Sequence, residues 1–245
     1  MNLPPKRGFL SLAIPSTSVW RIMGSIIMAG LLATPMARAG TISGTVRAQG
    51  KEGAEEDAGG GSYASKALKN AERINYDDVR DFVVYIKGSV PGAKLVRPLE
   101  EIHQKSATFV PHVLPIMVGA SVVFPNDDNI FHNVFSKSDA APFDLGLYKK
   151  GDQAKRVPFN KPGEVDVFCS IHARMNCIIL VLENPYFAVA DSRGRFTITN
   201  VPPGTYTLCA WQERLPQDSQ IITVPEEGDR TSINFVLGPK NLPRY

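Results

Sequence analysis

Histidine and cysteine are scarce in this chain of 245 residues, which has four histidines and three cysteines. So few histidines exclude a multicopper oxidase, because such an enzyme needs many histidines to hold its additional copper ions. The sequence also lacks a Ser/His/Asp arrangement for nucleophilic catalysis and a glycine-rich phosphate loop. These absences argue against catalysis, and we expect the protein not to be an enzyme.

Long apolar runs are also absent. The main apolar stretch, Ile22 to Leu32, is shorter than the roughly 20 residues that an ordinary transmembrane helix needs. It follows the basic residues Lys6 and Arg7 and precedes Ala37-Arg38-Ala39, a small-x-small cleavage site. We therefore expect residues 1–39 to be a signal peptide that is cleaved near Ala39. The mature protein would be periplasmic, with no stable membrane insertion; an uncleaved anchor is the alternative.

The net charge of the chain, +3 at pH 7, is no longer positive once that segment is set aside. Of the 27 basic residues in the chain, four lie in residues 1–39, namely Lys6, Arg7, Arg21 and Arg38, and no acidic residue lies there. The mature chain therefore has 23 basic against 24 acidic residues, a net charge near −1. No basic stripe remains to attract phosphates, so we expect no nucleic-acid partner.

Almost the whole chain after Gly40 has the pattern of short strands separated by turns. The stretch TISGTVR (41–47) alternates like a half-buried strand, and DFVVYIKG (81–88) is rich in β-branched residues and ends at a glycine. The good helix candidate is 62–74, with Ser62 as its N-cap. Many short strands with frequent turns predict an all-β protein built from sandwiches or barrels.

We divide the mature chain into three parts. An early strand and a polar insert occupy residues 40–80, a first β unit occupies 81–183, and a second β unit occupies 184–245. The second unit is thin for an independent sandwich, because a small domain buries proportionally less of its surface. Strand 41–47 or strand 81–88 is a candidate to complete its sheet, in which case the first unit would be an insertion within the second.

Side chains that bind metals gather in FCSIHARM (168–175), which holds Cys169, His172 and Met175. His132 lies on a predicted strand in FPNDDNIFHNVFS, about 40 residues earlier. Two imidazoles and a thiolate with a weak axial thioether are the ligand set of type 1 copper. Zinc competes for cysteine and histidine, but structural zinc sites usually take four such ligands and methionine binds zinc poorly. We therefore predict one copper ion.

The spacing of these residues suits a rigid site. Cys169 ends a predicted strand, and a short connection brings His172 beside it. Met175 follows where the next strand begins, and His132 ties the loop to a neighbouring strand. A rigid site changes little between Cu(I) and Cu(II), which lowers the reorganisation cost of electron transfer.

Two motifs make the chain similar to the cupredoxins, the small blue copper proteins: FPNDDNIFHNV (124–134) and PGEVDVFCSIHARM (162–175). The resemblance covers roughly 81–183, and the Cys-x-x-His-x-x-Met spacing resembles the short ligand loop of amicyanin. The chain more closely resembles exported bacterial plastocyanin/amicyanin-like proteins of the methylamine utilization protein type. Those proteins join a cupredoxin to a carboxypeptidase-regulatory-like β-sandwich, which FDLGLY and GRFTITNVPPGTYTL resemble here.

This resemblance implies a fold and further site residues. The fold would be a cupredoxin Greek-key β-sandwich plus a small sandwich of the carbohydrate-binding-like kind, which is a fold analogy and no sign of sugar binding. Asn133 matches the residue whose backbone N–H faces the thiolate, and Ser170 matches the hydroxyl that hydrogen-bonds to that asparagine. Ile171 departs from the pattern, because the loops of plastocyanin and amicyanin usually have proline there; isoleucine keeps its N–H.

The first functional hypothesis is a periplasmic electron carrier that cycles between Cu(I) and Cu(II) and docks transiently on redox partner proteins. Copper handling or sensing is the alternative, with the metal as cargo. A carbohydrate-binding-like module with structural copper is the third. We expect His103 and His112 to be structural residues. Whether Cys177 and Cys209 pair in an oxidising compartment stays open.

Overall fold

The computed structural model describes residues 38–50, 74–94, 98–227 and 230–238. These residues form 17 strands and one short 3-10 helix, η1 (Tyr76–Asp78), which confirms the predicted all-β class. The predicted signal peptide lies outside the described residues except for its last two positions, and the predicted helix 62–74 does so except for Ile74. Within the described ranges, no helix has the length and apolar character needed to cross a membrane.

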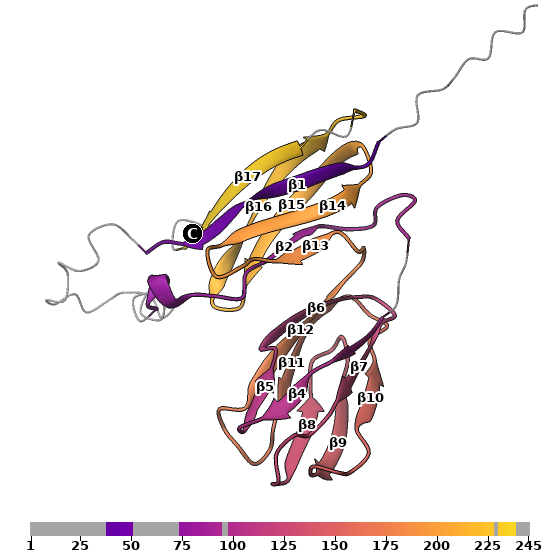
Figure 1. Cartoon of the computed structure of the whole chain (residues 1–245), viewed down its shortest axis with the longest axis vertical. Helices are drawn as coiled ribbons and strands as arrows, with labels where there is room; N and C mark the ends of the chain where they lie inside the picture. The colour runs from indigo at the N-terminus through magenta and orange to yellow at the C-terminus, as the bar shows by residue number, and fades with distance from the viewer. Residues whose placement is uncertain (1–37, 51–73, 95–97, 228–229, 239–245) are drawn as a thin grey trace, which may run out of the picture. The chain divides into compact units, whose positions relative to one another are not determined.

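One β-sandwich is built from strands between β3 and β12 (Figure 1). Its larger sheet has the strand order β6-β12-β11-β8-β9, its smaller sheet has the order β10-β7-β3, and β4 and β5 form a separate hairpin. The strands are β3 (Leu99–Glu101), β4 (His103–Lys105), β5 (Thr108–Val110), β6 (Val113–Met117), β7 (Ser121–Phe124), β8 (His132–Ser136), β9 (Phe143–Tyr148), β10 (Lys155–Pro158), β11 (Gly163–Phe168) and β12 (Asn176–Leu182).

Apolar side chains from these strands form one core, and two of the four predicted metal ligands lie within it. Strand β11 alternates, with Val165 and Val167 fully buried between more exposed residues. Strand β12 is buried along almost its whole length, as its continuous apolar sequence predicts. Cys169 and Met175 belong to the same buried cluster as Val165 and Val167, so the ligand loop is attached directly to the core.

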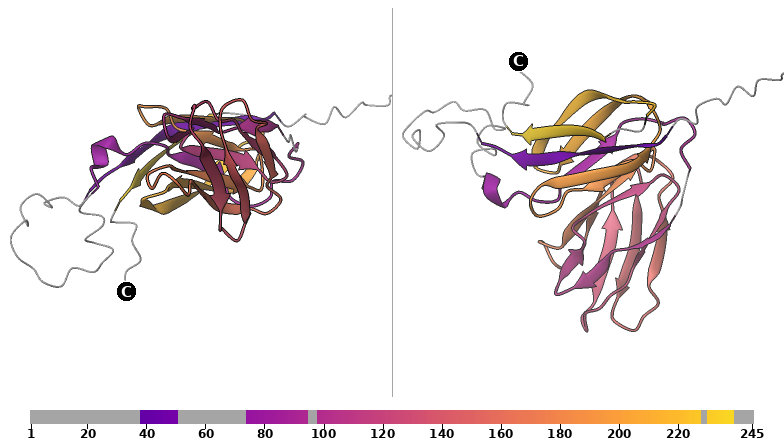
Figure 2. Two further views of the ribbon diagram at one scale, coloured as in Figure 1. Left: turned by 90° about the horizontal axis from the view of Figure 1, so that it is seen from below. Right: turned by 45° about the horizontal axis from the view of Figure 1, so that its top comes forward.

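A second β-sandwich is formed by sheets of order β14-β1-β17 and β13-β2-β15-β16 (Figures 1 and 2). In the first sheet β1 pairs antiparallel with β14 and parallel with β17. Its strands are β1 (Gly40–Ala48), β2 (Val83–Ile86), β13 (Phe187–Val189), β14 (Arg195–Val201), β15 (Gly204–Gln212), β16 (Leu215–Val224) and β17 (Arg230–Leu237). The core of this sandwich includes Ile42, Phe196 and Phe235.

The pairing of β2 corrects one predicted boundary. We expected the metal-binding unit to begin at residue 81, but Val83–Ile86 pairs with β15 and β13. Strands 41–47 and 81–88 were both candidates to complete the second sandwich, and both do so. Strands β3 to β12, which form the sandwich with the predicted metal ligands, are therefore inserted in the chain between strands of the other sandwich. An apolar strand pattern predicts a strand but does not say which sheet it joins.

Candidate metal centre

His132 is the first residue of β8 and is held inside the larger sheet. Strand β8 lies between β9 and β11, with His132 opposite Tyr148 in the ladder. The side chain is 0% exposed. Its Nδ1 atom lies 3.1 Å from Nδ1 of His172, and its Nε2 atom lies 2.9 Å from Oδ2 of Asp128. The two ring nitrogens therefore face different partners.

The other predicted ligands lie on the loop that joins β11 to β12. These strands are antiparallel neighbours, with Phe168 opposite Asn176, so the seven intervening residues must turn back sharply. Two backbone hydrogen bonds close the turn: the Cys169 N–H donates to the Met175 carbonyl (3.1 Å), and the Met175 N–H donates to the His172 carbonyl (3.0 Å). The loop thus brings its first and last ligands together and leaves His172 between them.

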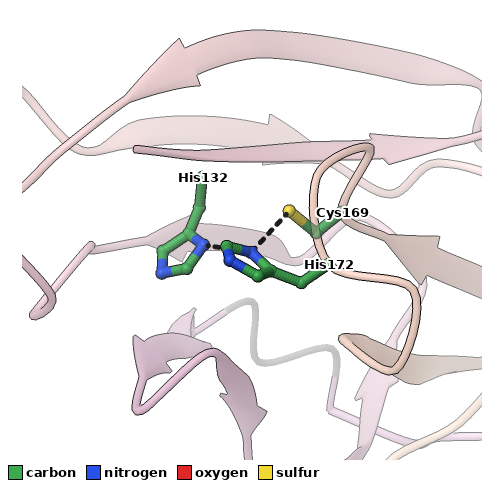
Figure 3. A group of neighbouring side chains, drawn as sticks. All are labelled: His132, Cys169 and His172. Carbon is green, nitrogen blue, oxygen red and sulfur yellow. Dashed lines mark hydrogen bonds between the residues drawn. The ribbon is translucent and has the colours of Figure 1, made fainter. Parts of the chain in front are cut away.

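Three of the four predicted ligands converge (Figure 3). One ligand atom from each of His132, Cys169 and His172 lies within 4.8 Å of the others, and Cys169 Sγ is 3.8 Å from His172 Nδ1. Among the described residues this is the single group of its kind. Met175, the fourth predicted ligand, ends the same loop, and its side chain is 1% exposed in the core that also contains Cys169.

The donor set fits a copper ion. An ionised Asp128 carboxylate can only accept a hydrogen bond from His132 Nε2. The proton of a neutral His132 ring is therefore assigned to Nε2, and Nδ1 keeps its lone pair. That lone pair faces the side of the ring where His172 and Cys169 lie. Two imidazole nitrogens and one thiolate suit copper better than the harder divalent ions, and Met175 would add a thioether from the same loop.

Asn133 follows His132 and is almost completely buried. Its amide Nδ2 donates to Oδ1 of Asp144 (2.7 Å), whereas its Oδ1 is buried with no hydrogen-bond partner among the described residues. The Gly146 N–H and the Asn133 amide together lower the pKa of the Asp144 carboxyl below its usual value. The side chain of Asn133 is therefore anchored to β9.

Ser170 does not make the hydrogen bond to Asn133 that the resemblance implies. Cys169 is directed into the core, and the neighbouring Ser170 is exposed. Ile171 is 50% exposed. Among the described residues, its N–H has no hydrogen-bond acceptor in either the backbone or the side chains. The Ile171 N–H therefore does not donate to a carbonyl of the loop.

Asp128 is a site residue that the sequence analysis missed. It lies four residues before His132 in NDDNIFH, within a motif in which the sequence analysis named only His132 and Asn133 as site residues. Burial raises the pKa of this carboxyl, but hydrogen bonds from the Ala107 N–H and from His132 outweigh that effect, so the pKa lies below its usual value. The signal that could have identified Asp128 from the sequence is its position four residues before a predicted histidine ligand.

The remaining two histidines lie beside carboxylates. His103 lies between Oε2 of Glu101 (3.0 Å) and Oδ2 of Asp127 (2.9 Å). His112 Nε2 lies 2.9 Å from Oε2 of Glu213, and the hydrogen bond between them raises the His112 pKa.

All three cysteines are unpaired in the structure. Burial raises the pKa values of the Cys177 and Cys209 thiols, which keeps both protonated at neutral pH. The Cys177–Cys209 pairing that the sequence left open is therefore not formed.

Comparison with known proteins gives one family match and several similar folds. The family model described as polysaccharide lyase family 4, domain II, matches residues 183–233. No curated protein matches the chain. A copper-containing nitrite reductase from Thermus scotoductus SA-01 aligns with 32% identity and a TM-score of 0.33, covering 40% of this chain. This chain spans only 25% of that enzyme.

Two smaller proteins align with the chain over most of their own length. A mutant of amicyanin in its Cu(I) form aligns with 21% identity and a TM-score of 0.32, over 40% of this chain and 97% of amicyanin. A purple cupredoxin from Nitrosopumilus maritimus aligns with 22% identity and a TM-score of 0.28, over 34% of this chain and 98% of that protein. These likenesses concern the fold.

Proposed function

We propose that this protein is a type 1 copper protein that carries single electrons in the periplasm. The observation that supports the proposal most directly is the convergence of His132, Cys169 and His172, with ligand atoms within 4.8 Å of one another at the end of a buried core. In this proposal Met175 is the weak axial ligand. Copper would supply the one-electron couple between Cu(II) and Cu(I).

The residues around the site support electron transfer because they hold the ligand atoms in place. His132 is fixed by the β8 ladder, and the loop is closed by backbone hydrogen bonds at Cys169 and Met175. A site whose side chains are already placed needs little rearrangement when the charge of the bound ion changes. The apolar core beside Cys169 and Met175 excludes water from that side of the ligands.

Exposed apolar residues adjoin the ligands along the chain and support transient docking of a redox partner protein. Phe131 precedes His132 and is 49% exposed, Phe168 precedes Cys169 and is 41% exposed, and Ile171 is half exposed. His172 is partly exposed on the same loop. Apolar side chains of this kind suit a short-lived protein contact close to the redox centre.

We propose that the protein is not an enzyme and that copper is a resident cofactor. Within the described residues, His103 and His112 have carboxylate partners and are not directed to a second metal group. We propose further that the chain is an exported protein in which a cupredoxin is inserted into a carboxypeptidase-regulatory-like sandwich. Copper handling and glycan recognition remain the competing functions, and each makes a different prediction.

A copper reconstitution experiment separates these functions. The protein is expressed with its N-terminal segment, recovered from the periplasm and loaded with one equivalent of Cu(II). We expect an intense band at about 600 nm from a Cu–thiolate bond. We also expect copper to be retained through dialysis against a moderate chelator. Copper that exchanges freely would support handling, and glycan-array binding that persists without copper would support the third function. The mass of the recovered protein tests cleavage near Ala39.

A further inference from the structure

We propose that Asp128, itself held by the tip of the β4–β5 hairpin, is a positioning residue that keeps the proton of His132 on Nε2 and so leaves Nδ1 ready to bind the metal. The inference rests on the proposed copper site for its consequence. Its structural basis, a fixed ring tautomer, can be measured without any metal.

Three N–H groups converge on the Asp128 carboxylate. Oδ1 accepts the Ser106 backbone N–H (2.8 Å), and Oδ2 accepts the Ala107 backbone N–H (2.9 Å). Oδ2 also lies 2.9 Å from Nε2 of His132. A carboxylate can only accept, so the histidine must donate at this contact. A neutral imidazole has one N–H, and Nδ1 is therefore the free base.

The hairpin tip is built to hold this carboxylate. Lys105 pairs with Thr108, so Ser106 and Ala107 form a two-residue turn. Both have positive φ angles, 55° and 54°, although neither is glycine or asparagine. Turns of this type favour those two residues because other side chains are strained there. Strain of this kind persists where surrounding contacts over-determine the conformation, and here two successive N–H groups bind one carboxylate.

Asp128 is also fixed from its own backbone. Its N–H donates to Oδ1 of Asn126 (2.8 Å). The amide of Asn126 in turn donates to the carbonyls of Ile130 (3.1 Å) and Tyr148 (2.9 Å), which ties the turn to β9. The Asp128 side chain is 17% exposed, so water has little access to compete for its hydrogen bonds. The carboxylate thus has a defined direction before any metal arrives.

A different role is also consistent with these contacts: Asp128 could serve only to brace the hairpin. The two roles differ in what they predict for the His132 ring. A brace would leave the ring free to populate both tautomers, whereas a positioning residue selects one. Metal ligands are commonly oriented in this way by a carboxylate on the other ring nitrogen.

The first test is the tautomer of His132 in the metal-free protein, read from the ¹⁵N shifts of its ring at neutral pH. We expect the proton on Nε2 in the natural protein. A proton on Nδ1, or an even mixture of tautomers, would overturn the proposal. This measurement needs no variant and no copper, so it holds its meaning even if the proposed electron-carrier function is wrong.

The second test is Asp128→Asn. An amide has one acceptor oxygen and an NH2 group that can only donate, so at least one of the three converging N–H groups loses its acceptor. The backbone groups of Ser106 and Ala107 cannot give up their protons, but His132 can move its proton to Nδ1. We therefore expect the tautomer to shift and the affinity for Cu(II) in a chelator competition to fall by roughly 10- to 100-fold.

The control is Asp127→Asn, the neighbouring carboxylate, which faces His103 instead. We expect it to leave both the His132 tautomer and the Cu(II) affinity unchanged within about twofold. If Asp128→Asn binds Cu(II) as tightly as this control, Asp128 is only a brace. If Asp128→Asn does not fold, the tautomer in the natural protein still decides the proposal.

Discussion

The two sides of the candidate centre are built differently. His132 is on the strand side: it is the first residue of β8, is completely buried, and has its second nitrogen held by Asp128. Cys169, His172 and Met175 are on the loop side, in a seven-residue turn closed by two backbone hydrogen bonds. On the strand side the β8 ladder and a carboxylate fix His132, and on the loop side the core and the loop's own backbone hydrogen bonds fix Cys169 and Met175. In the proposed copper site the strand side would supply one buried imidazole, whereas the loop side would supply the thiolate, the thioether and the partly exposed His172.

The largest effect that we predict on the loop side is from Cys169→Ala. Without the thiolate, no charge-transfer band at about 600 nm can form, so the protein should be colourless with Cu(II) or show only weak absorption. A visible spectrum of the copper-loaded variant measures this. Cys177→Ala is the matched control, because that thiol is buried and its pKa is raised. A band that survives in Cys169→Ala but disappears in Cys177→Ala would show that the ligand assignment is wrong.

The next effect should come from Met175→Gln, which tests whether the buried thioether is axial. A harder oxygen donor favours Cu(II), so the site should keep its colour while its reduction potential falls. A tenfold increase in the preference for Cu(II) corresponds to about 59 mV for one electron, and we expect a fall of at least that order. Voltammetry measures it. An unchanged potential would mean that Met175 only packs in the core.

A smaller effect is expected from Ile171→Pro. A backbone N–H directed at the thiolate withdraws electron density from sulfur, which destabilises Cu(II) and raises the potential. The Ile171 N–H has no acceptor among the described residues, which leaves it available for this role. Proline lacks that donor, so the potential should fall by less than in Met175→Gln. If the variant has an intact visible spectrum and an equal or higher potential, Ile171 is not a donor to the thiolate.

The smallest effect concerns stability at the exit of the loop, where His112 contacts the carbonyl of Asn176 (3.2 Å) and Glu213 (2.9 Å). The His112 pKa is raised and the Glu213 pKa is lowered in the folded protein. The pair therefore stabilises the fold between the unfolded pKa values of about 4.3 and 6.5. This stabilisation is lost as the pH rises through the folded His112 pKa or falls through that of Glu213. Chemical denaturation of His112→Gln over a pH range that extends beyond both of these limits should show a flatter pH dependence than the natural protein; parallel curves would contradict the assignment.

The comparison also shows which parts of the site a sequence can predict. The convergence of Cys169 and His172 follows from their spacing, because both residues lie within one short turn whose ends are set by adjacent strands. His132 was found because few histidines compete for the role. Asp128 was missed because its contacts depend on the β4–β5 hairpin, whose tip lies far from Asp128 in the sequence and contacts it only in the folded protein. Side-chain direction explains the remaining difference at Ser170, which is exposed.

The fold was predictable to a similar degree. Alternating and continuous apolar patterns identify strands, and the all-β class follows from their number. The partner of β2 was not predictable, because a short apolar strand fits the edge or the middle of either sandwich equally well. Its placement beside β15 and β13 depends on long-range packing. That packing makes the metal-binding sandwich an insertion in the chain.

A spectroelectrochemical titration of the copper-loaded protein tests the central claim most directly. The absorbance at about 600 nm is followed while the applied potential is stepped down and then back up. We predict that the band bleaches and returns completely, with one electron per chain in each direction. A band that never forms, or one that is lost on reduction and does not return because the copper has left, would contradict an electron carrier.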